Sequence, residues 1–485
     1  MRGVSLAGFV GFSLLAACLR FPSLDLMEFK SDEVAMHVRA AAVSGGHFPL
    51  SGIFSSLGVP NPPAAVYAFS LGGWASDDPL HMAGVSALLG SLAAGVTFLL
   101  GRRFFGWQVG CLAALIVSLS PWAILLSRKI WAQDLLPFFS VSLMYWLLDW
   151  WERPQARAAV LIPLLLALLL QIHFSAAIFI PLVLAAVALR QGQKYLLWWG
   201  VGAGLAALTF VPFALFLADF GASDYLAMIV GSSRNMSLTS MLARGAMHFL
   251  DMADFGSLGY VSRDAASNFM REPGALPWTR WIQVPMLVAG TGAALFSART
   301  QAGRWLVAWA GASIFGFAFG ARAPHPHYLA PALPCTALLM ALAIVPARAQ
   351  GRRVAWLCAG LFLLLGAANL HFTHVSRAEV AAGQWKGDSG IPYRDSLEGA
   401  RFLAARFGTD EPVELAATKE HFAVAYLAHR LGLDIPVPAG RVTGKNWVAV
   451  CVGPSRELPR RPAVETWRSE SGALRIGLLA PSDLR

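Results

Sequence analysis

Long apolar runs dominate the first three quarters of the chain. A span needs about 20 mostly apolar residues to cross the hydrocarbon of a bilayer, and about eleven such runs precede residue 370. We place them near residues 3–21, 80–100, 107–127, 133–150, 157–171, 174–189, 196–217, 281–297, 303–321, 327–346 and 353–370. The pattern predicts an α-helical polytopic membrane protein.

Composition supports this interpretation, because 56% of the 485 residues are hydrophobic and only 14% are charged. A net charge of +10 would suggest nucleic-acid binding in a soluble protein, yet the cations here fall in every second connection between spans. They are Arg2, Arg102, Arg103, Arg153, Arg157, Arg190, Lys194, Arg299, Arg304, Arg348, Arg352 and Arg353. The positive-inside rule then predicts a cytoplasmic N-terminus and an extracytoplasmic C-terminal region.

Hydropathy falls after residue 370, and the pattern changes to one of alternating helix and strand. Residues 396–407 and 420–431 are predicted as helices, and residues 413–417, 447–452 and 474–479 as strands. We therefore expect a transmembrane domain over 1–370, with long outer loops at 22–79 and 218–280, and a small extracytoplasmic α/β domain over 371–485. The first loop should contain a short helix near 33–43 that lies in the membrane interface. The five cysteines indicate no disulfide framework.

The acidic pair Asp32 and Glu33 follows the first span directly. A carboxylate here can accept a proton from a hydroxyl or amine that attacks the anomeric carbon of a sugar. Adjacent residues on a helix point about 100° apart, so only one of the two would face a given sugar. The other would orient a cation, cap the helix or face solvent. The alternative is structural, since Ser31 or Asp32 suits an N-cap and Glu33 the first turn.

A second candidate group lies in the turn after the third span, on the same predicted outer side. Asp134 is an ionisable residue at the rim of an apolar helix, which makes it a functional candidate. Arg128 and Lys129 form the only basic pair in a short outer turn, and their charge suits a phosphate. A salt bridge between Arg128 and Asp134, or anchoring to lipid headgroups, is the structural alternative.

Three further polar clusters are predicted on the outer side. Histidine can bind a phosphate or move a proton, and amide side chains can bind sugar hydroxyls. The candidates are Asn61 in the first loop, Gln171 and His173 between spans five and six, and His325, His327 and Tyr328 at the start of span ten. A zinc site from the last two histidines lacks a third ligand at suitable spacing. No Walker loop or dinucleotide fingerprint occurs, which disfavours a nucleotide-driven pump.

The order and sidedness of these motifs resemble the GT-C superfamily of membrane glycosyltransferases. The resemblance is to family 39, which includes protein O-mannosyltransferases and aminoarabinose lipid A transferases. Its motifs are Asp32-Glu33 after the first span, Pro62-Pro63 with Tyr67 before the second, Ser120-Pro121 through Asp134, and His327-Tyr328-Leu329 with Pro331 and Pro334. It covers roughly residues 1–370.

The resemblance implies a polyprenyl-phosphate sugar donor, chemistry at the outer leaflet of the inner (plasma) membrane, and an inverting displacement. Asp32 matches the family's first-loop aspartate, the general base, while Glu33 matches the second acid of the pair and Asp134 the later acidic residue. One departure is Asn61, where aminoarabinose transferases have a lysine before the two prolines. Arg128, Lys129 or His327 would then compensate for the missing phosphate contact.

We therefore predict an enzyme that transfers a sugar from a polyprenyl-phosphate carrier to an extracytoplasmic protein, lipid or polysaccharide. No cofactor is required by this pattern, although it leaves room for a divalent cation. Two alternatives remain, namely a flippase or transporter of lipid-linked sugars and an O-antigen ligase or polymerase that uses a diphosphate-linked oligosaccharide. A transporter should have polar or broken helices near the bilayer midplane, and most of the spans here are clean.

Overall fold

The computed structural model describes most of the chain. The described residues are 2–55, 58–190, 192–230, 237–252, 279–296, 301–320, 326–345, 352–383, 391–408, 413–416, 421–433, 435, 447–452, 463 and 465–480. They fall into two compact units. The first unit holds Met1–Pro22, Arg39–Ser257 and Leu276–Leu370, and the second includes Ser23–Val38 and His371–Arg485.

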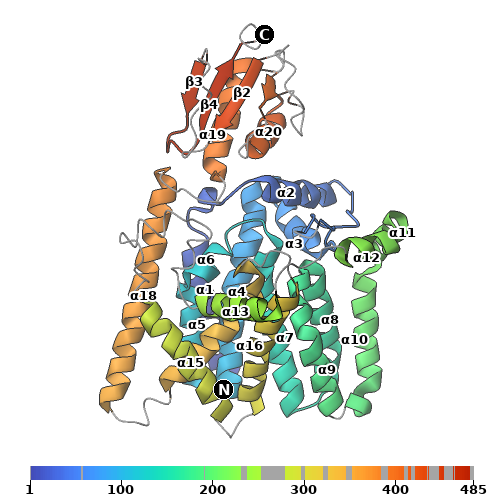
Figure 1. The fold of residues 1–485 in the computed structure, drawn as a ribbon, viewed down its shortest axis with the longest axis vertical. Helices are drawn as coiled ribbons and strands as arrows, with labels where there is room; N and C mark the ends of the chain where they lie inside the picture. The colour runs from blue at the N-terminus through green and yellow to red at the C-terminus, as the bar shows by residue number, and fades with distance from the viewer. Residues whose placement is uncertain are drawn as a thin grey trace. The chain divides into compact units, whose positions relative to one another are not determined.

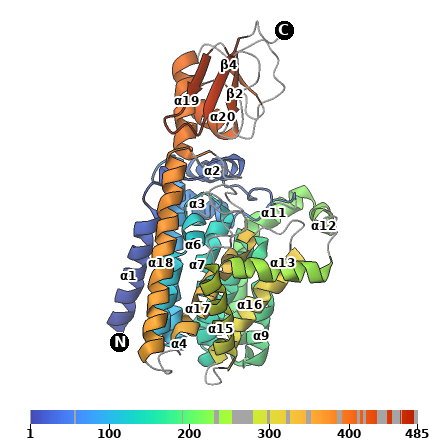
Figure 2. The ribbon, with the colours of Figure 1, turned by 60° about the vertical axis from the view of Figure 1, so that its left-hand side comes forward.

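The first unit is helical throughout its described part, and its long helices run along a common direction (Figure 1 and Figure 2). Its longer helices are α1 (Arg2–Arg20), α4 (Pro79–Phe105), α5 (Trp107–Leu119), α7 (Leu136–Glu152), α8 (Ala156–Ile172), α9 (Phe179–Leu189), α10 (Leu196–Thr209), α15 (Arg280–Phe296), α16 (Gln301–Gly320), α17 (Leu333–Ile344) and α18 (Arg352–Ala381). Shorter ones are α3 (Ala64–Gly73), α6 (Pro121–Leu125), α11 (Val211–Phe220), α12 (Ala222–Val230) and α13 (Leu238–Asp251), joined by 3-10 turns η2 (Ala132–Leu135), η3 (Phe174–Ile178), η4 (Gly192–Tyr195) and η6 (Pro326–Ala332). Each predicted span coincides with a helix or with two successive helical segments.

Local sequence signals explain where these helices begin. The Asp78 side chain accepts a hydrogen bond of 2.9 Å from Leu80 N, and Pro79 occupies the first helical turn of α4. Ser120 and Pro121 start α6 in the same way. The break between α5 and α6 thus follows from a Ser-Pro pair that caps a new helix.

Helix α4 lies at the centre of the first unit and packs against α1, α5 and α7. Small residues permit the close approach, because a Cβ on Gly101 would lie only 2.7 Å from Gly110 Cα of α5. This close packing of small residues is characteristic of helices in membranes.

Among the described residues, three helical segments are long and apolar enough to cross a membrane by themselves. They are Pro79–Phe105, His327–Ile344 and Trp356–Ala381, and the pair α10 and α11, bent by 50°, forms a fourth candidate. Several predicted spans are divided into shorter helices by Pro or a 3-10 turn. The total of about eleven crossings stays a prediction.

The second unit contains a four-stranded sheet with strand order β1-β2-β4-β3 (Figure 1). Strands β1 (Val413–Leu415) and β2 (Trp447–Val452) pair in parallel, whereas β4 (Arg475–Leu479) runs antiparallel to both β2 and β3 (Glu465–Arg468). Helix α19 (Tyr393–Phe407) lies against the sheet at Gly399, where a Cβ would meet Ile476 at 3.1 Å. The α/β pattern predicted from the sequence is confirmed, and β3 was not predicted.

The first loop contains the short helix that the sequence predicts, α2 (Ser31–Ser44). The sequence assigns residues 22–79 to one outer loop of the helical domain, yet Ser23–Val38 clusters with the chain from His371 onward. Backbone hydrogen bonds explain this, since Phe29 N donates to Ile391 O at 3.3 Å and Tyr393 N to Met27 O at 2.9 Å.

Candidate functional site

The turn between α6 and α7 carries the basic pair and Asp134, and it is fastened to α4. The Ser86 hydroxyl donates to Lys129 O at 2.7 Å, and the Ser127 hydroxyl donates to Ala123 O at 2.6 Å. A Cβ on Gly90 of α4 would collide with Ser127, so glycine is needed for this approach. The turn is therefore held rigidly even though it lacks regular structure.

Lys129 lies over an aromatic ring inside this turn. Its Nζ is 3.9 Å from the centroid of the Trp131 ring, and the side chain of Lys129 is only 8% exposed. A desolvated contact of this kind contributes about 2 kcal/mol. The electron-rich ring face attracts the ammonium group of Lys129.

The aromatic contacts continue from Trp131 into two other segments of the first unit. The Trp131 and His327 rings are 4.4 Å apart, His327 and Tyr328 4.6 Å, and Tyr328 stacks on His173 at 5.4 Å. We call Lys129, Trp131, His173, His327 and Tyr328 the cation–aromatic cluster. It joins three predicted site segments that are far apart in the sequence.

His173 has a defined tautomer in this cluster. Its Nδ1 accepts a hydrogen bond of 3.1 Å from Ser175 N, so the proton of the neutral ring lies on Nε2. Burial lowers the pKa of His173 from 6.5 to about 4. The ring is therefore neutral near pH 7 and can donate a hydrogen bond through Nε2.

Asp134 lies in η2, which packs against η6 and therefore against the segment that carries His327. Its side chain is 1% exposed. The neighbouring Gln133 is also buried, and its Oε1 has no hydrogen-bond partner among the described residues. A buried carboxylate and a buried amide acceptor thus adjoin the cation–aromatic cluster.

Arg128 uses part of its guanidinium to hold the end of α1. Nε donates to Arg20 O at 3.1 Å and Nη2 to Pro22 O at 2.8 Å. These two bonds attach the turn to the end of α1. Arg20 itself is fully buried and donates to Ser118 O and Val117 O at the end of α5.

The other predicted binding residues of the first unit donate hydrogen bonds to other residues of the same unit. Gln171 Nε2 donates to Thr209 Oγ1 at 2.6 Å, Asn61 Nδ2 to Ile53 O at 3.1 Å, and the Tyr67 hydroxyl to Pro49 O at 2.7 Å. Asn61 Oδ1 is buried without a hydrogen-bond partner in the described part of the chain. His325 lies outside the described residues.

The acidic pair belongs to the second unit, where its two members have different environments. Glu33 is fully buried, and its Oε2 accepts a hydrogen bond of 3.2 Å from Lys30 N, as in a capping box. Asp32 is exposed. Since Asp32 and Asp134 lie in different units, their meeting in one cavity stays a prediction.

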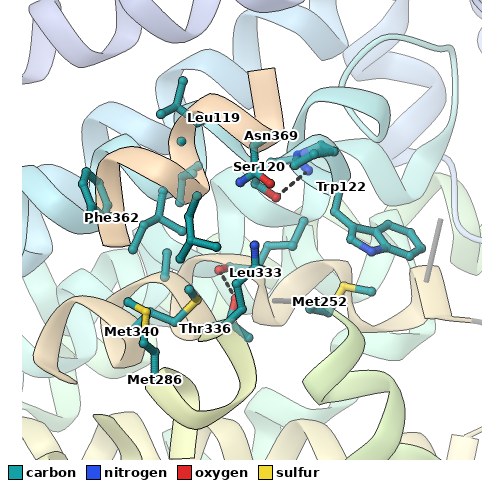
Figure 3. A pocket seen from close by; sticks show the side chains of 18 residues that line it. Leu119, Ser120, Trp122, Met252, Met286, Leu333, Thr336, Met340, Phe362 and Asn369 are labelled. Carbon is teal, nitrogen blue, oxygen red and sulfur yellow. Dashed lines mark hydrogen bonds between the residues drawn. The ribbon is translucent and has the colours of Figure 1, made fainter. Parts of the chain in front are cut away.

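The first unit also contains a small, mainly apolar cavity of about 40 Å³. Figure 3 shows Trp122, Met252, Met286, Met340 and Phe362 around it. Ser120, Gln283, Thr336 and Asn369 add polar groups, and Gln283 Oε1 is buried with no hydrogen-bond partner in the described chain. The mainly apolar lining suits an apolar group, such as part of a lipid chain.

Trp131 is a site residue that the sequence analysis did not single out. Its signal was present, because an aromatic side chain two positions after Lys129 in one short turn can cover the ammonium. The contact with His327 had no such signal. No three His, Cys, Asp or Glu side chains form a metal-binding group within the part of the chain that the structure describes.

No family model matches the sequence, and no curated protein is similar to it. Solved structures do match. ArnT from Cupriavidus metallidurans, bound to undecaprenyl phosphate, has a TM-score of 0.61 at 14% identity, over 97% of this chain and 97% of that chain. The apo state of the same protein gives 0.61 at 15% identity, over 98% of each chain.

A second match is the archaeal oligosaccharyltransferase AglB from Archaeoglobus fulgidus, in complex with an inhibitory peptide and a dolichol-phosphate. Its TM-score is 0.51 at 14% identity, over 93% of this chain and 69% of that chain. ArnT and AglB are both GT-C glycosyltransferases. The resemblance that the sequence motifs indicate is confirmed at the level of the fold: this chain has the GT-C fold.

Proposed function

We propose that this protein is a membrane glycosyltransferase that moves a sugar from a polyprenyl-phosphate carrier to an extracytoplasmic acceptor, with inversion at the anomeric carbon. The GT-C fold over nearly the whole chain supports a lipid-linked donor, because the similar structures hold undecaprenyl phosphate in ArnT and dolichol-phosphate in AglB. We further propose a multi-pass inner-membrane protein with a cytoplasmic N-terminus and an extracytoplasmic C-terminal domain.

The observation that carries the proposal is the cation–aromatic cluster next to Asp134. A phosphate needs positive charge and hydrogen-bond donors, and Lys129 supplies the charge while His173 supplies an N–H group. His327 and Tyr328 would contact the donor from η6. Arg128 would add positive charge, and its planar guanidinium suits phosphate oxygens.

The apolar cavity beside α6 would hold part of the isoprenoid chain. Its walls come from α5, α6, α15, α17, α18 and the end of α13, and they consist mainly of apolar side chains, including Met252, Met286 and Met340. Methionine adapts to irregular apolar ligands because its side chain is unbranched and flexible. Asn61, Tyr67 and Gln171 are proposed to line the sugar or acceptor site, together with His325.

The chemical step needs one base and a stabilised leaving group. The oxygen or nitrogen of the acceptor hydroxyl or amine bonds to the anomeric carbon, and the Asp32 carboxylate takes up the proton that this group loses. The bond from that carbon to the phosphate oxygen breaks, and the polyprenyl phosphate leaves with the electron pair. Positive charge beside the departing phosphate lowers the barrier. Asp134 orients the sugar or the acceptor, and Glu33 supports Asp32 by starting helix α2.

A divalent cation is compatible with this scheme without being required. An oligosaccharyltransferase structure from Archaeoglobus fulgidus, with a TM-score of 0.52 at 14% identity over 91% of this chain and 67% of that chain, is a complex with Zn and sulfate. In this chain, Lys129 and Arg128 already offer positive charge to a phosphate.

A flippase is the second candidate, and one observation favours it. Helices α10 and α11 form a span with a 50° bend, and broken helices are typical of transporters. The two functions differ in whether the bond between sugar and phosphate is broken.

A transport and transfer assay would distinguish a transferase from a flippase. Purified protein in vesicles is given one radiolabelled undecaprenyl-phosphate sugar at a time, together with lipid, protein or polysaccharide acceptors. We expect label on an acceptor and release of undecaprenyl phosphate. Movement of intact labelled carrier across the bilayer without release would support a flippase instead. Transfer only from an undecaprenyl-diphosphate oligosaccharide would support a ligase or polymerase.

A further inference from the structure

The segment that carries Asp32 is attached to the C-terminal domain by backbone pairing. Residues Glu28 and Pro392 form an antiparallel bridge, flanked by the hydrogen bonds Tyr393 N to Met27 O at 2.9 Å and Phe29 N to Ile391 O at 3.3 Å. The paired residues end at Phe29, two positions before the first residue of α2, and at Tyr393, the first residue of α19. The start of α2 is therefore fixed relative to α19.

Aromatic side chains form a second attachment around Phe29, which is 1% exposed. Its ring lies edge-on to Tyr393 at 5.3 Å and within 6.4 Å of Tyr426, which belongs to α20 (His421–Arg430). His37 of α2 shares a hydrogen bond of 2.6 Å with the Tyr426 hydroxyl. Edge-to-face contacts and a buried hydrogen bond both require a defined geometry.

The helical phase of α2 links these contacts to Asp32. Glu33 and His37 are four residues apart and share one face, and both are fully buried. Asp32 precedes Glu33, so it points about 100° away from this face and is exposed. Rotation of α2 about its axis would move the Asp32 carboxylate and would break the bond between His37 and Tyr426.

We propose that the C-terminal domain positions the general base, with His37 and Tyr426 as positioning residues that set the rotation of α2 and so the direction of Asp32. The inference rests on the proposed function. It gives the C-terminal domain a role in the chemical step, beyond binding an acceptor or covering a cavity. Neither residue touches the reacting atoms in this scheme.

The test is Tyr426→Phe in the full-length protein, which removes the hydroxyl and keeps the ring. We expect kcat to fall about tenfold with an unchanged KM for the donor, and the melting temperature to fall by a few degrees because His37 loses its hydrogen-bond partner, with the protein still folded at the assay temperature. Tyr195→Phe is the matched control, because it removes a hydroxyl that donates to Pro154 O at 2.7 Å in the first unit. The control should keep wild-type kcat.

A second variant keeps the test decisive if Tyr426→Phe fails to fold. His37→Gln keeps a group that can hydrogen-bond to the Tyr426 hydroxyl but places it at a different distance from the helix. This variant should lower kcat and leave KM unchanged. The double variant should lose no more activity than the worse single variant, since both act through one bond.

Wild-type kcat in both single variants would overturn the inference, and so would a fall in kcat matched by the Tyr195→Phe control. The proposed function fails separately. A wild-type protein that transfers no sugar from any polyprenyl phosphate would overturn both proposals. Loss of transfer in Asp32→Asn with normal kcat in Tyr426→Phe and His37→Gln would overturn only the positioning role.

Discussion

The two candidate regions arrange their charged groups in opposite ways. In the first unit, Lys129 and Asp134 are buried, and Lys129 lies against the Trp131 ring. In the second unit, Asp32 is exposed on α2, about 100° around the helix from the buried Glu33 and next to the face that also holds His37. A phosphate-binding group gains from a desolvated, preordered site, because electrostatic attraction is stronger there. A base must instead reach an acceptor that arrives from outside.

The largest expected effect is the loss of sugar transfer on substitution of the exposed Asp32. Asp32→Asn removes the proton acceptor but changes neither side-chain size nor a packed surface, so the protein should stay folded. Transfer should fall by about a hundredfold or more. The measurement is the initial rate of label transfer, with the melting temperature as the control for folding. Normal transfer would exclude Asp32 as the base and make Glu33 the next candidate.

The next effect tests the buried cation. Lys129→Met keeps an apolar side chain under Trp131 but removes the charge, and we expect the KM for the donor to rise about tenfold. Lys194→Met is the matched control, since Lys194 Nζ also lies over a ring, that of Tyr195 at 5.9 Å, yet its side chain is exposed. An equal rise in the donor KM in both variants would contradict the proposal that Lys129 binds the donor phosphate.

A smaller effect separates the two acids of the pair. Glu33→Ala removes the acceptor for Lys30 N and should lower the free energy of unfolding by about 1 kcal/mol, as loss of a helix cap does. Glu33→Gln keeps an oxygen acceptor and should retain most of the stability and most of the transfer. Thermal unfolding followed by circular dichroism measures the first effect. Loss of transfer in Glu33→Gln at normal stability would instead assign chemistry to Glu33.

The smallest effect concerns pH. The unfolded chain protonates His173 near 6.5, whereas the folded protein does so only near pH 4, because burial lowers the pKa of this ring. The unfolded state therefore binds more protons in this window, and stability decreases as the pH falls through it. Between pH 7 and pH 6 the loss should be below about 1 kcal/mol. Melting temperatures of the wild type and His173→Asn should converge as the pH falls, and parallel curves would contradict the assignment.

Hydrophobic length and Pro, Gly and Ser signals were sufficient to predict the long apolar helices of the first unit and most of the α/β domain, but not the shorter helices α3, α12 and α13, which lie in the predicted outer loops. The strand β3 was missed because its four residues, Glu465 to Arg468, include a single apolar side chain, Trp467, and so give no alternating pattern. The Ser-Pro break before α6 could be located in the sequence but not interpreted as a helix start that directs the turn toward α4. The position of the turn against α4 depends on Gly90, because only glycine leaves room for Ser127 there.

By itself, the sequence determined the helical membrane architecture, the C-terminal α/β domain and the types of residue that carry the proposed chemistry. These properties follow from local hydrophobicity, periodicity and side-chain chemistry. Only the tertiary structure decided that Trp131 joins Lys129 to His327 and that Glu33 faces inward while Asp32 faces out. It alone also decided that the first-loop acids belong with the C-terminal domain. The reason is physical: such contacts join residues up to several hundred positions apart, and their partners are selected by shape and burial that no local pattern encodes.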